Sequence, residues 1–140
     1  MRILAVDYGE RRTGLAATDD LGITAQGLDT IVARCDEDIL CSIAETARRL
    51  DAERIVLGLP LNMNGTESEK SLKVRVFGEE LERTTGRTVV FWDERMTSIQ
   101  AHRVMRETKR KIRGNKPVVD TISAVLMLQE YLKTLPGTSG

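Results

Sequence analysis

The amino-acid sequence predicts an α/β protein with a mixed five-stranded sheet, three antiparallel strands followed by parallel ones, flanked by helices. In the first 32 residues, apolar runs alternate with tight turns, which is typical of an antiparallel meander. Further along, apolar runs at 54–59 and 87–92 are separated by amphipathic segments, the pattern of parallel strands joined by helices. The chain has 140 residues, 41% of them hydrophobic, so we expect one domain over 1–134 and a flexible tail at 135–140.

Three strands are predicted at the start of the chain. Residues 2–7 contain four consecutive apolar residues followed by Asp7, the pattern of a buried strand that ends in a carboxylate. A turn with two glycines leads to a second strand at 13–18. The sequence Asp-Asp-Leu-Gly at 19–22 is typical of a hairpin turn and precedes a third strand at 23–32.

Two helices and a strand follow. Residues 36–50 show apolar side chains every three to four positions, with acids in the first turn and arginines in the last, which favours a helix. Residues 54–59 form a short apolar strand. A second helix is expected over 67–85, with Leu72 and Val76 among the apolar residues along it, and Gly86 ends it.

One more strand and two more helices complete the chain. The strand at 87–92 ends, like the first, in carboxylates. Thr97 or Ser98 is a typical cap for a helix that continues to about residue 108. After a basic segment, a final, largely apolar helix is expected from about 118 to 133.

The positive charge of the chain is concentrated in one segment. The net charge is zero, with 21 basic and 21 acidic residues, but residues 109–116 carry five positive charges and no acid. The five are Lys109, Arg110, Lys111, Arg113 and Lys116. Like charges at this density repel, so we expect a mobile, extended clamp that binds a polyanion; the alternative is a solvated loop.

The composition indicates a cytoplasmic protein that does not contact a membrane. No apolar run is long enough to span a bilayer, and the N-terminal apolar run meets a charge at position 7, unlike a signal peptide. Cys35 and Cys41 are expected to be free thiols in a reducing compartment.

Three groups of carboxylates have positions that suggest a common site. Asp7 ends the first strand, Asp93 and Glu94 end the fifth, and Asp120 opens an apolar helix. Ligands of such sheets bind at the carboxyl ends of parallel strands, and clustered carboxylates there usually hold a divalent cation. Taken singly, these acids also fit a turn, a solvated strand end and a helix start. The pattern alone does not choose between Asp93 and Glu94, because neighbours on a strand face opposite ways.

Four blocks of sequence carry a resemblance to a known family. They are Val6–Gly9 with Gly14–Ala16, Gly58–Asn62 with Asn64–Thr66, Asp93–Arg95 with Thr97, Ser98 and Ala101, and Lys116–Asp120 with Ser123 and Ala124. In this order and spacing, the chain resembles the YqgF/RuvX family of Holliday-junction resolvases, also described as nucleases that mature pre-16S ribosomal RNA. The resemblance implies a ribonuclease-H-like fold and an endonuclease acting on structured RNA or branched DNA.

The same resemblance implies a catalytic metal site. Asp7, Glu94 and Asp120 would hold one or two Mg²⁺ or Mn²⁺ ions for an in-line phosphodiester cleavage. Asp93 would then orient Glu94 or cap the turn.

Other polar residues are candidates for substrate binding. Asn62 and Asn64 offer amides to a phosphate, although a loop held together by its own hydrogen bonds fits equally well. Arg95 would contact the scissile phosphate or pair with a carboxylate. Arg11 lies in the first turn, where an exposed charge is the alternative to a contact with the substrate backbone. His102 is expected at the surface.

Two other functions remain open at this point. Asp7-Tyr8-Gly9 with a later glycine also resembles the first phosphate loop of the actin, hexokinase and Hsp70 superfamily, which would make the chain half of a phosphotransferase or ATPase. A non-catalytic nucleic-acid-binding module is the other alternative. A junction resolvase should be a homodimer, whereas an RNA-processing nuclease can be a monomer.

Overall fold

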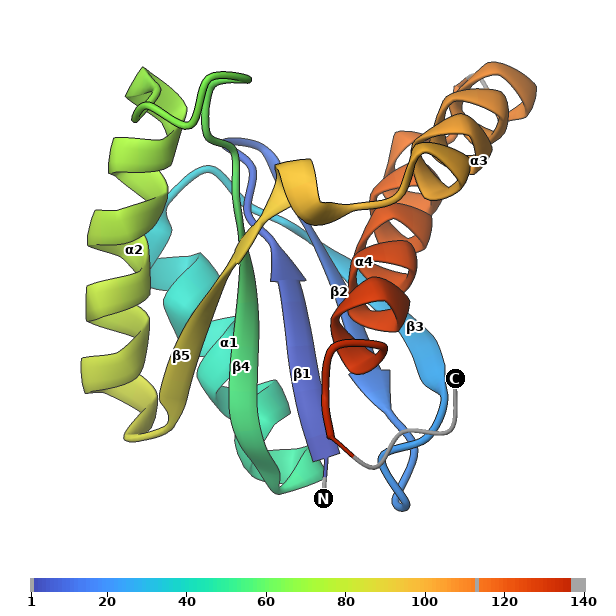
Figure 1. Cartoon of the computed structure of the whole chain (residues 1–140). Helices are drawn as coiled ribbons and strands as arrows, with labels where there is room; N and C mark the ends of the chain where they lie inside the picture. The colour runs from blue at the N-terminus through green and yellow to red at the C-terminus, as the bar shows by residue number, and fades with distance from the viewer. Residues whose placement is uncertain (1, 113, 137–140) are drawn as a thin grey trace.

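The computed structural model describes residues 2–112 and 114–136, and it confirms the predicted mixed sheet of five strands (Figure 1). The elements in chain order are β1 (Arg2–Asp7), β2 (Arg12–Thr18), β3 (Ala25–Val32), α1 (Asp36–Leu50), β4 (Ala52–Leu59), α2 (Glu69–Thr85), β5 (Thr88–Asp93), the 3₁₀ turn η1 (Glu94–Met96), α3 (Ile99–Lys111) and α4 (Lys116–Leu132).

The strand order of the sheet is β3-β2-β1-β4-β5. The first three strands pair antiparallel, with Asp7 opposite Gly14. Strand β4 pairs parallel with β1, and β5 pairs parallel with β4. The carboxyl ends of β1, β4 and β5 therefore lie at one edge of the sheet, together with the start of β2 and the end of β3.

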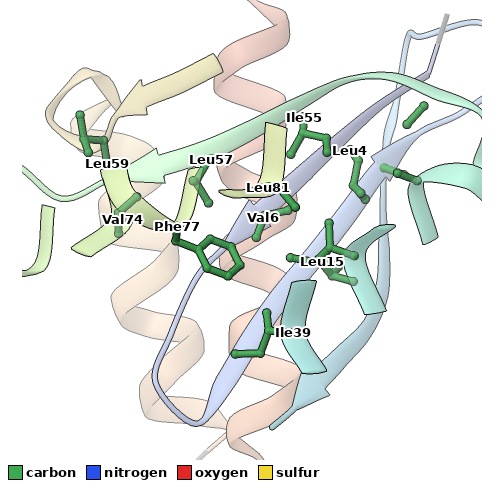
Figure 2. Close-up of a cluster of buried hydrophobic side chains, with 14 residues drawn as sticks. Leu4, Val6, Leu15, Ile39, Ile55, Leu57, Leu59, Val74, Phe77 and Leu81 are labelled. Atoms are coloured by element: carbon green, nitrogen blue, oxygen red, sulfur yellow. The ribbon is translucent and has the colours of Figure 1, made fainter. Parts of the chain in front are cut away.

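Helices cover both faces of the sheet, with α1 and α2 on one side and α4 on the other (Figure 1). Because side chains alternate along a strand, each strand contributes to two separate cores. Leu4 and Val6 of β1 pack with Ile39 of α1 and Phe77 of α2 in the first core, much of which Figure 2 shows. Glycines let the layers approach closely: a Cβ on Gly78 of α2 would lie 2.6 Å from the ring of Phe91.

The second core lies between the sheet and α4. Ile3 and Ala5 of β1 and Trp92 of β5 contact Ala124 and Leu128 of α4 there. Trp92 and its neighbour Phe91 thus face opposite sides of the sheet, as alternation requires.

Apolar side chains lie on both the exposed and the buried face of α2. Leu72 and Val76 are 54% and 63% exposed, whereas Val74, Phe77 and Leu81 face the first core. The helix is amphipathic, but apolar residues also occupy its solvent side.

The basic segment is not the extended clamp that its charge predicted. Helix α3 continues to Lys111, and α4 begins at Lys116 with the Asn115 side chain accepting a hydrogen bond from the Val118 amide. Cations in the last turn of a helix interact favourably with the helix dipole, which offsets the repulsion between them. Arg113 lies outside the described residues.

The end of the described chain is packed against the second core. Leu135 contacts this core, although it belongs to the expected flexible tail, of which residues 137–140 lie outside the described part. Within the described residues, no helix is long and apolar enough to cross a bilayer. Cys35 and Cys41 are both exposed free thiols.

Candidate active site

The alternation of side chains brings Asp7 and Glu94 to the same face of the sheet. Asp7 is in phase with Ile3 and Ala5, which pack under α4, and Glu94 follows Trp92, which does the same. Asp93 is in phase with Phe91 and the opposite core. Glu94 therefore lies on the face that α4 covers, together with Asp7, and Asp93 lies on the opposite face. The sequence pattern had left the choice between these two acids open.

Two glycines make room for the acids on this face. A Cβ on Gly58 of β4 would lie 2.9 Å from Oε1 of Glu94, so the carboxylate rests on the bare backbone of the neighbouring strand. A Cβ on Gly14 of β2 would lie 2.2 Å from the carbonyl oxygen of Asp120, so the first turns of α4 also sit directly on the sheet. Both glycines belong to the sequence blocks that carry the family resemblance.

Asp7 and Glu94 line a common cavity of about 200 Å³ at the carboxyl edge of the sheet. Lys70 from the first turn of α2 and Lys109 from the last turn of α3 line it too. The remaining lining residues are Thr97, His102, Met105, Ser123 and Met127. The cavity thus combines two acids with two lysines, a composition suited to a cation and a phosphate together.

Burial and mutual repulsion perturb both acids. Burial, together with the charges of Glu94 and Asp120, raises the pKa of Asp7 to about 7, against the opposing effect of Lys70 and Lys109. Burial also raises the pKa of Glu94. Desolvated carboxylates of this kind gain strongly from a nearby cation.

Asp120 is close enough to act on Asp7 but is engaged elsewhere. Its Oδ2 accepts a hydrogen bond of 2.8 Å from Nε of Arg12, and the side chains of the two residues are 25% and 32% exposed. Among the described residues, no group of three or more His, Cys, Asp or Glu side chains has the geometry of a metal site. The structure therefore brings together two of the three predicted ligands and holds the third in an ion pair.

The donor set fits a hard divalent cation. Asp7 and Glu94 offer only carboxylate oxygens, the ligands preferred by Mg²⁺ and Mn²⁺. Mg²⁺ commonly takes one or two carboxylates and completes its shell with water and substrate phosphate, so the number and type of acids here match what such an ion requires from the protein.

Arg95 and the loop after β4 are occupied by internal contacts. Arg95 donates to both carboxylate oxygens of Asp93, from Nε at 3.1 Å and from Nη2 at 2.7 Å, and these bonds hold the pKa of Asp93 below its ordinary value. Asp93 also caps η1. In the loop, the Asn62 amide donates to Thr66 and the Asn64 side chain accepts from Thr66. The loop is thus held together by its own hydrogen bonds, which is one of the two alternatives that the sequence offered for these asparagines. Both asparagines remain exposed.

The predicted basic residues divide between two places. Lys109 lines the acid cavity, whereas Arg11 and Lys116 line a separate hollow. Arg110 and Lys111 are exposed on the last turn of α3.

Among the polar residues that line the cavity, Lys70 was not predicted, His102 was expected only at the surface, and Ser123 was named only within a block of the family resemblance. His102 is exposed, as expected, but it also lines the cavity. His102 lies one helical turn after the cap Ser98 and close in sequence to Glu94, and this position could have predicted that it lies near the acids. Lys70 had no such signal, because only the packing of α2 beside the sheet brings it to this edge.

Comparison with known proteins gives consistent matches over nearly the whole chain. The family model described as "RuvX: Holliday junction resolvase" matches residues 1–134. A protein of Koribacter versatilis named "Putative pre-16S rRNA nuclease" is 43% identical over 132 residues, covering 94% of this chain and 86% of that protein. A protein of Agathobacter rectalis with the same name is 42% identical over 138 residues, covering 96% of each.

Solved structures agree on the fold. The chain is similar to T. thermophilus RuvC in complex with Holliday junction substrate, with a TM-score of 0.61 and 16% identity over 99% of this chain and 97% of that one. It is also similar to the fowlpox virus Holliday junction resolvase, with a TM-score of 0.58 and 13% identity over 96% of this chain and 100% of that one. These likenesses confirm the ribonuclease-H-like fold.

Proposed function

Because the chain belongs to the RuvX family of Holliday junction resolvases, a family of nucleases, we propose that it is a metal-dependent endonuclease that cleaves phosphodiester bonds of structured nucleic acid. The observation that carries the proposal is the cavity in which Asp7 and Glu94 meet Lys70 and Lys109. Family membership favours this activity over the phosphotransferase and the non-catalytic alternatives.

The residues of the cavity have distinct roles in this proposal. Asp7 and Glu94 would hold the cation, with Asp120 as a further ligand when it leaves Arg12. A bound Mg²⁺ or Mn²⁺ would supply an activated water and neutralise charge on the phosphate. Lys70 and Lys109 bind the non-bridging oxygens of the scissile phosphate, where charge develops during the reaction.

The reaction itself is a hydrolysis. The water oxygen forms a bond to phosphorus in line with the leaving O3′, and the P–O3′ bond breaks. The electron pair of that bond stays on O3′, which takes up a proton from solvent, while the attacking water gives up one proton to solvent. The products are a 3′-hydroxyl and a 5′-phosphate.

The names of the relatives favour the precursor of 16S rRNA as the substrate of this chain. Two proteins that are more than 40% identical to this chain over the aligned residues are named "Putative pre-16S rRNA nuclease". We propose cleavage near the 5′ end of this precursor, in the bacterial cytoplasm where it is transcribed. A four-way DNA junction is the competing substrate, since the family is described by it.

Cleavage of both substrates in parallel tests the proposal. The purified protein is incubated with Mn²⁺ and either a labelled 5′ fragment of pre-16S rRNA or a labelled four-way DNA junction, and its oligomeric state on each is measured by light scattering. We expect Mn²⁺-dependent cleavage of the RNA, with a 5′-phosphate on the product. Efficient, symmetric cleavage of the junction by a dimer, without cleavage of the RNA, would assign the other substrate.

Two variants separate catalysis from folding. Asp7→Asn should abolish cleavage, because it removes a ligand charge from the cavity. Asp51→Asn makes the same chemical change at the opposite end of the sheet, at the C-cap of α1 in a left-handed conformation that asparagine adopts readily, and should cleave normally. Full activity of Asp7→Asn, or of the unmodified protein in EDTA, would contradict the proposed function.

A further inference from the structure

A second hollow lies at the same edge of the sheet as the acid cavity. It has a volume of about 550 Å³ and is lined by Arg11, Arg12, Arg34 and Lys116, with apolar walls from Val32 and Pro117 among others. No acidic residue is among the described residues that line it. Four cations thus surround one shaped hollow, and one of them, Arg12, is paired with an acid, Asp120, outside its lining. Such a concentration of positive charge favours the binding of an anion.

The backbone holds these cations in place. Arg12 pairs with Val32 across the sheet, and the Ala33 amide donates to the carbonyl of Arg11 at 3.1 Å, which brings Arg34 beside the β1–β2 turn. The first turn of α4 is fastened to β3, because the Thr30 hydroxyl donates to the carbonyl of Pro117 at 2.6 Å. The hollow is therefore built from three segments that the sheet keeps together.

Arg12 connects the hollow to the acid cavity. It lines the hollow and at the same time donates to Asp120, whose charge reaches Asp7. The Arg12–Asp120 pair thus adjoins the hollow through Arg12, and Asp120 acts on an acid of the other cavity. A nucleic-acid backbone that passes along this edge would present one phosphate to the acid cavity and another to the hollow.

We propose that the hollow binds a non-scissile backbone phosphate of the nucleic-acid substrate, and that this phosphate takes Arg12 away from Asp120. Asp120 is then free to join Asp7 and Glu94 only when substrate is bound. The inference rests on the proposed nuclease function and extends it, since it makes Arg12 a positioning residue that couples substrate binding to completion of the metal site.

The exchange is energetically accessible. Both side chains of the Arg12–Asp120 pair keep contact with solvent, which screens their attraction and can hydrate each group when the pair opens. A phosphate offers the guanidinium a bidentate partner, and the neighbouring arginines add to its binding. The released carboxylate gains a cation in place of the arginine.

The first arm of the test measures nucleic-acid binding. Affinities for the labelled RNA and the labelled junction are measured in EDTA over a series of salt concentrations. Arg34→Ala should flatten the dependence of log affinity on log salt by about one unit, the effect of losing one phosphate contact. Arg49→Ala removes an exposed arginine from the last turn of α1, at the opposite end of the sheet, and should leave the slope unchanged.

Equal slopes for the two variants would overturn the proposal. The thermal stabilisation of each variant by inorganic phosphate is measured as well. If Arg34→Ala loses this stabilisation but keeps the salt dependence of nucleic-acid binding, the proposal is also overturned, because the hollow would then be a site for a free anion and not for nucleic acid.

The second arm measures the coupling through Arg12, without nucleic acid and without catalysis. The affinity for Mn²⁺ is measured by calorimetry in the unmodified protein, Arg12→Ala, Asp120→Asn and the double variant. Asp120→Asn should weaken Mn²⁺ binding several-fold more in the Arg12→Ala background, where Asp120 is free, than in the unmodified protein. Equal losses in both backgrounds would show that Arg12 does not withhold Asp120.

The outcome also separates this inference from the proposed function. Absence of Mn²⁺ binding by the unmodified protein would reject both. Normal Mn²⁺ binding and cleavage, with no effect of Arg34→Ala or no coupling in the cycle, would reject the inference alone.

Discussion

Asp7→Asn is expected to make the protein more stable at alkaline pH, although it abolishes cleavage. The pKa of Asp7 is raised from 3.8 to about 7 in the folded protein by burial and by Glu94 and Asp120. At a pH between these two pKa values, Asp7 is protonated in the folded protein but has lost its proton in the unfolded chain. The stability contributed by the protonated Asp7 is therefore complete below the unfolded pKa and disappears as the pH rises through the folded one.

The magnitude follows from the size of this change. At about 1.36 kcal/mol per pKa unit, a pKa raised from 3.8 to about 7 corresponds to a loss of at most about 4 kcal/mol of the free energy of unfolding. Asp7 keeps part of its solvent exposure, so we expect about half of this limit, roughly 2 kcal/mol. Asparagine carries no charge at any of these pH values and avoids the loss.

Urea unfolding in EDTA, followed by the fluorescence of Trp92, measures the effect. Going from about pH 5 to about pH 8, the stability of Asp7→Asn relative to the unmodified protein should rise by roughly 1–2 kcal/mol. Asp51→Asn, far from the cavity, should show no such rise. A relative stability that stays constant or falls with pH would refute the account of Asp7 as a desolvated, repelled carboxyl.

Mn²⁺ should reverse the order of stability. A ligand present at about 100 times its dissociation constant stabilises a protein by about 2.7 kcal/mol, and only the unmodified protein has the intact acid pair. Equal stabilisation of Asp7→Asn by Mn²⁺ would place the metal elsewhere.

Three further predictions concern the neighbours of Asp7. Glu94→Gln should weaken Mn²⁺ binding in calorimetric titration at least tenfold more than Asp93→Asn, because only Glu94 lines the cavity; equal losses would mean that the wrong neighbour was chosen. Gly58→Ala should weaken Mn²⁺ binding without removing a ligand, since the new Cβ would lie 2.9 Å from Oε1 of Glu94; unchanged affinity would show that the carboxylate can move aside freely. Lys109→Ala should flatten the salt dependence of nucleic-acid binding by about one unit and Arg110→Ala should not, because successive helical side chains point about 100° apart. Similar slopes for the two would show that the cavity does not receive the phosphate.

The order of elements could be predicted because it depends on local patterns. Alternating or continuous apolar runs identified all five strands, and Ser98 and Gly86 marked helix ends through caps that involve only nearby residues. The expectation of an extended segment is wrong at 109–111, where the density of positive charge argues against a helix. The continuation of α3 to Lys111 shows that helix propagation and the dipole outweigh repulsion between a few exposed cations.

The sequence by itself determined the sheet, the helices and the set of acids at strand ends, because strand and helix periodicities are properties of short segments. It did not determine which neighbour, Asp93 or Glu94, faces Asp7, because this depends on which face of the sheet α4 covers. Nor did it indicate the pairing of Arg12 with Asp120, which are 108 residues apart. Only the tertiary structure decided these points, since packing, not local periodicity, brings distant side chains within reach of one another.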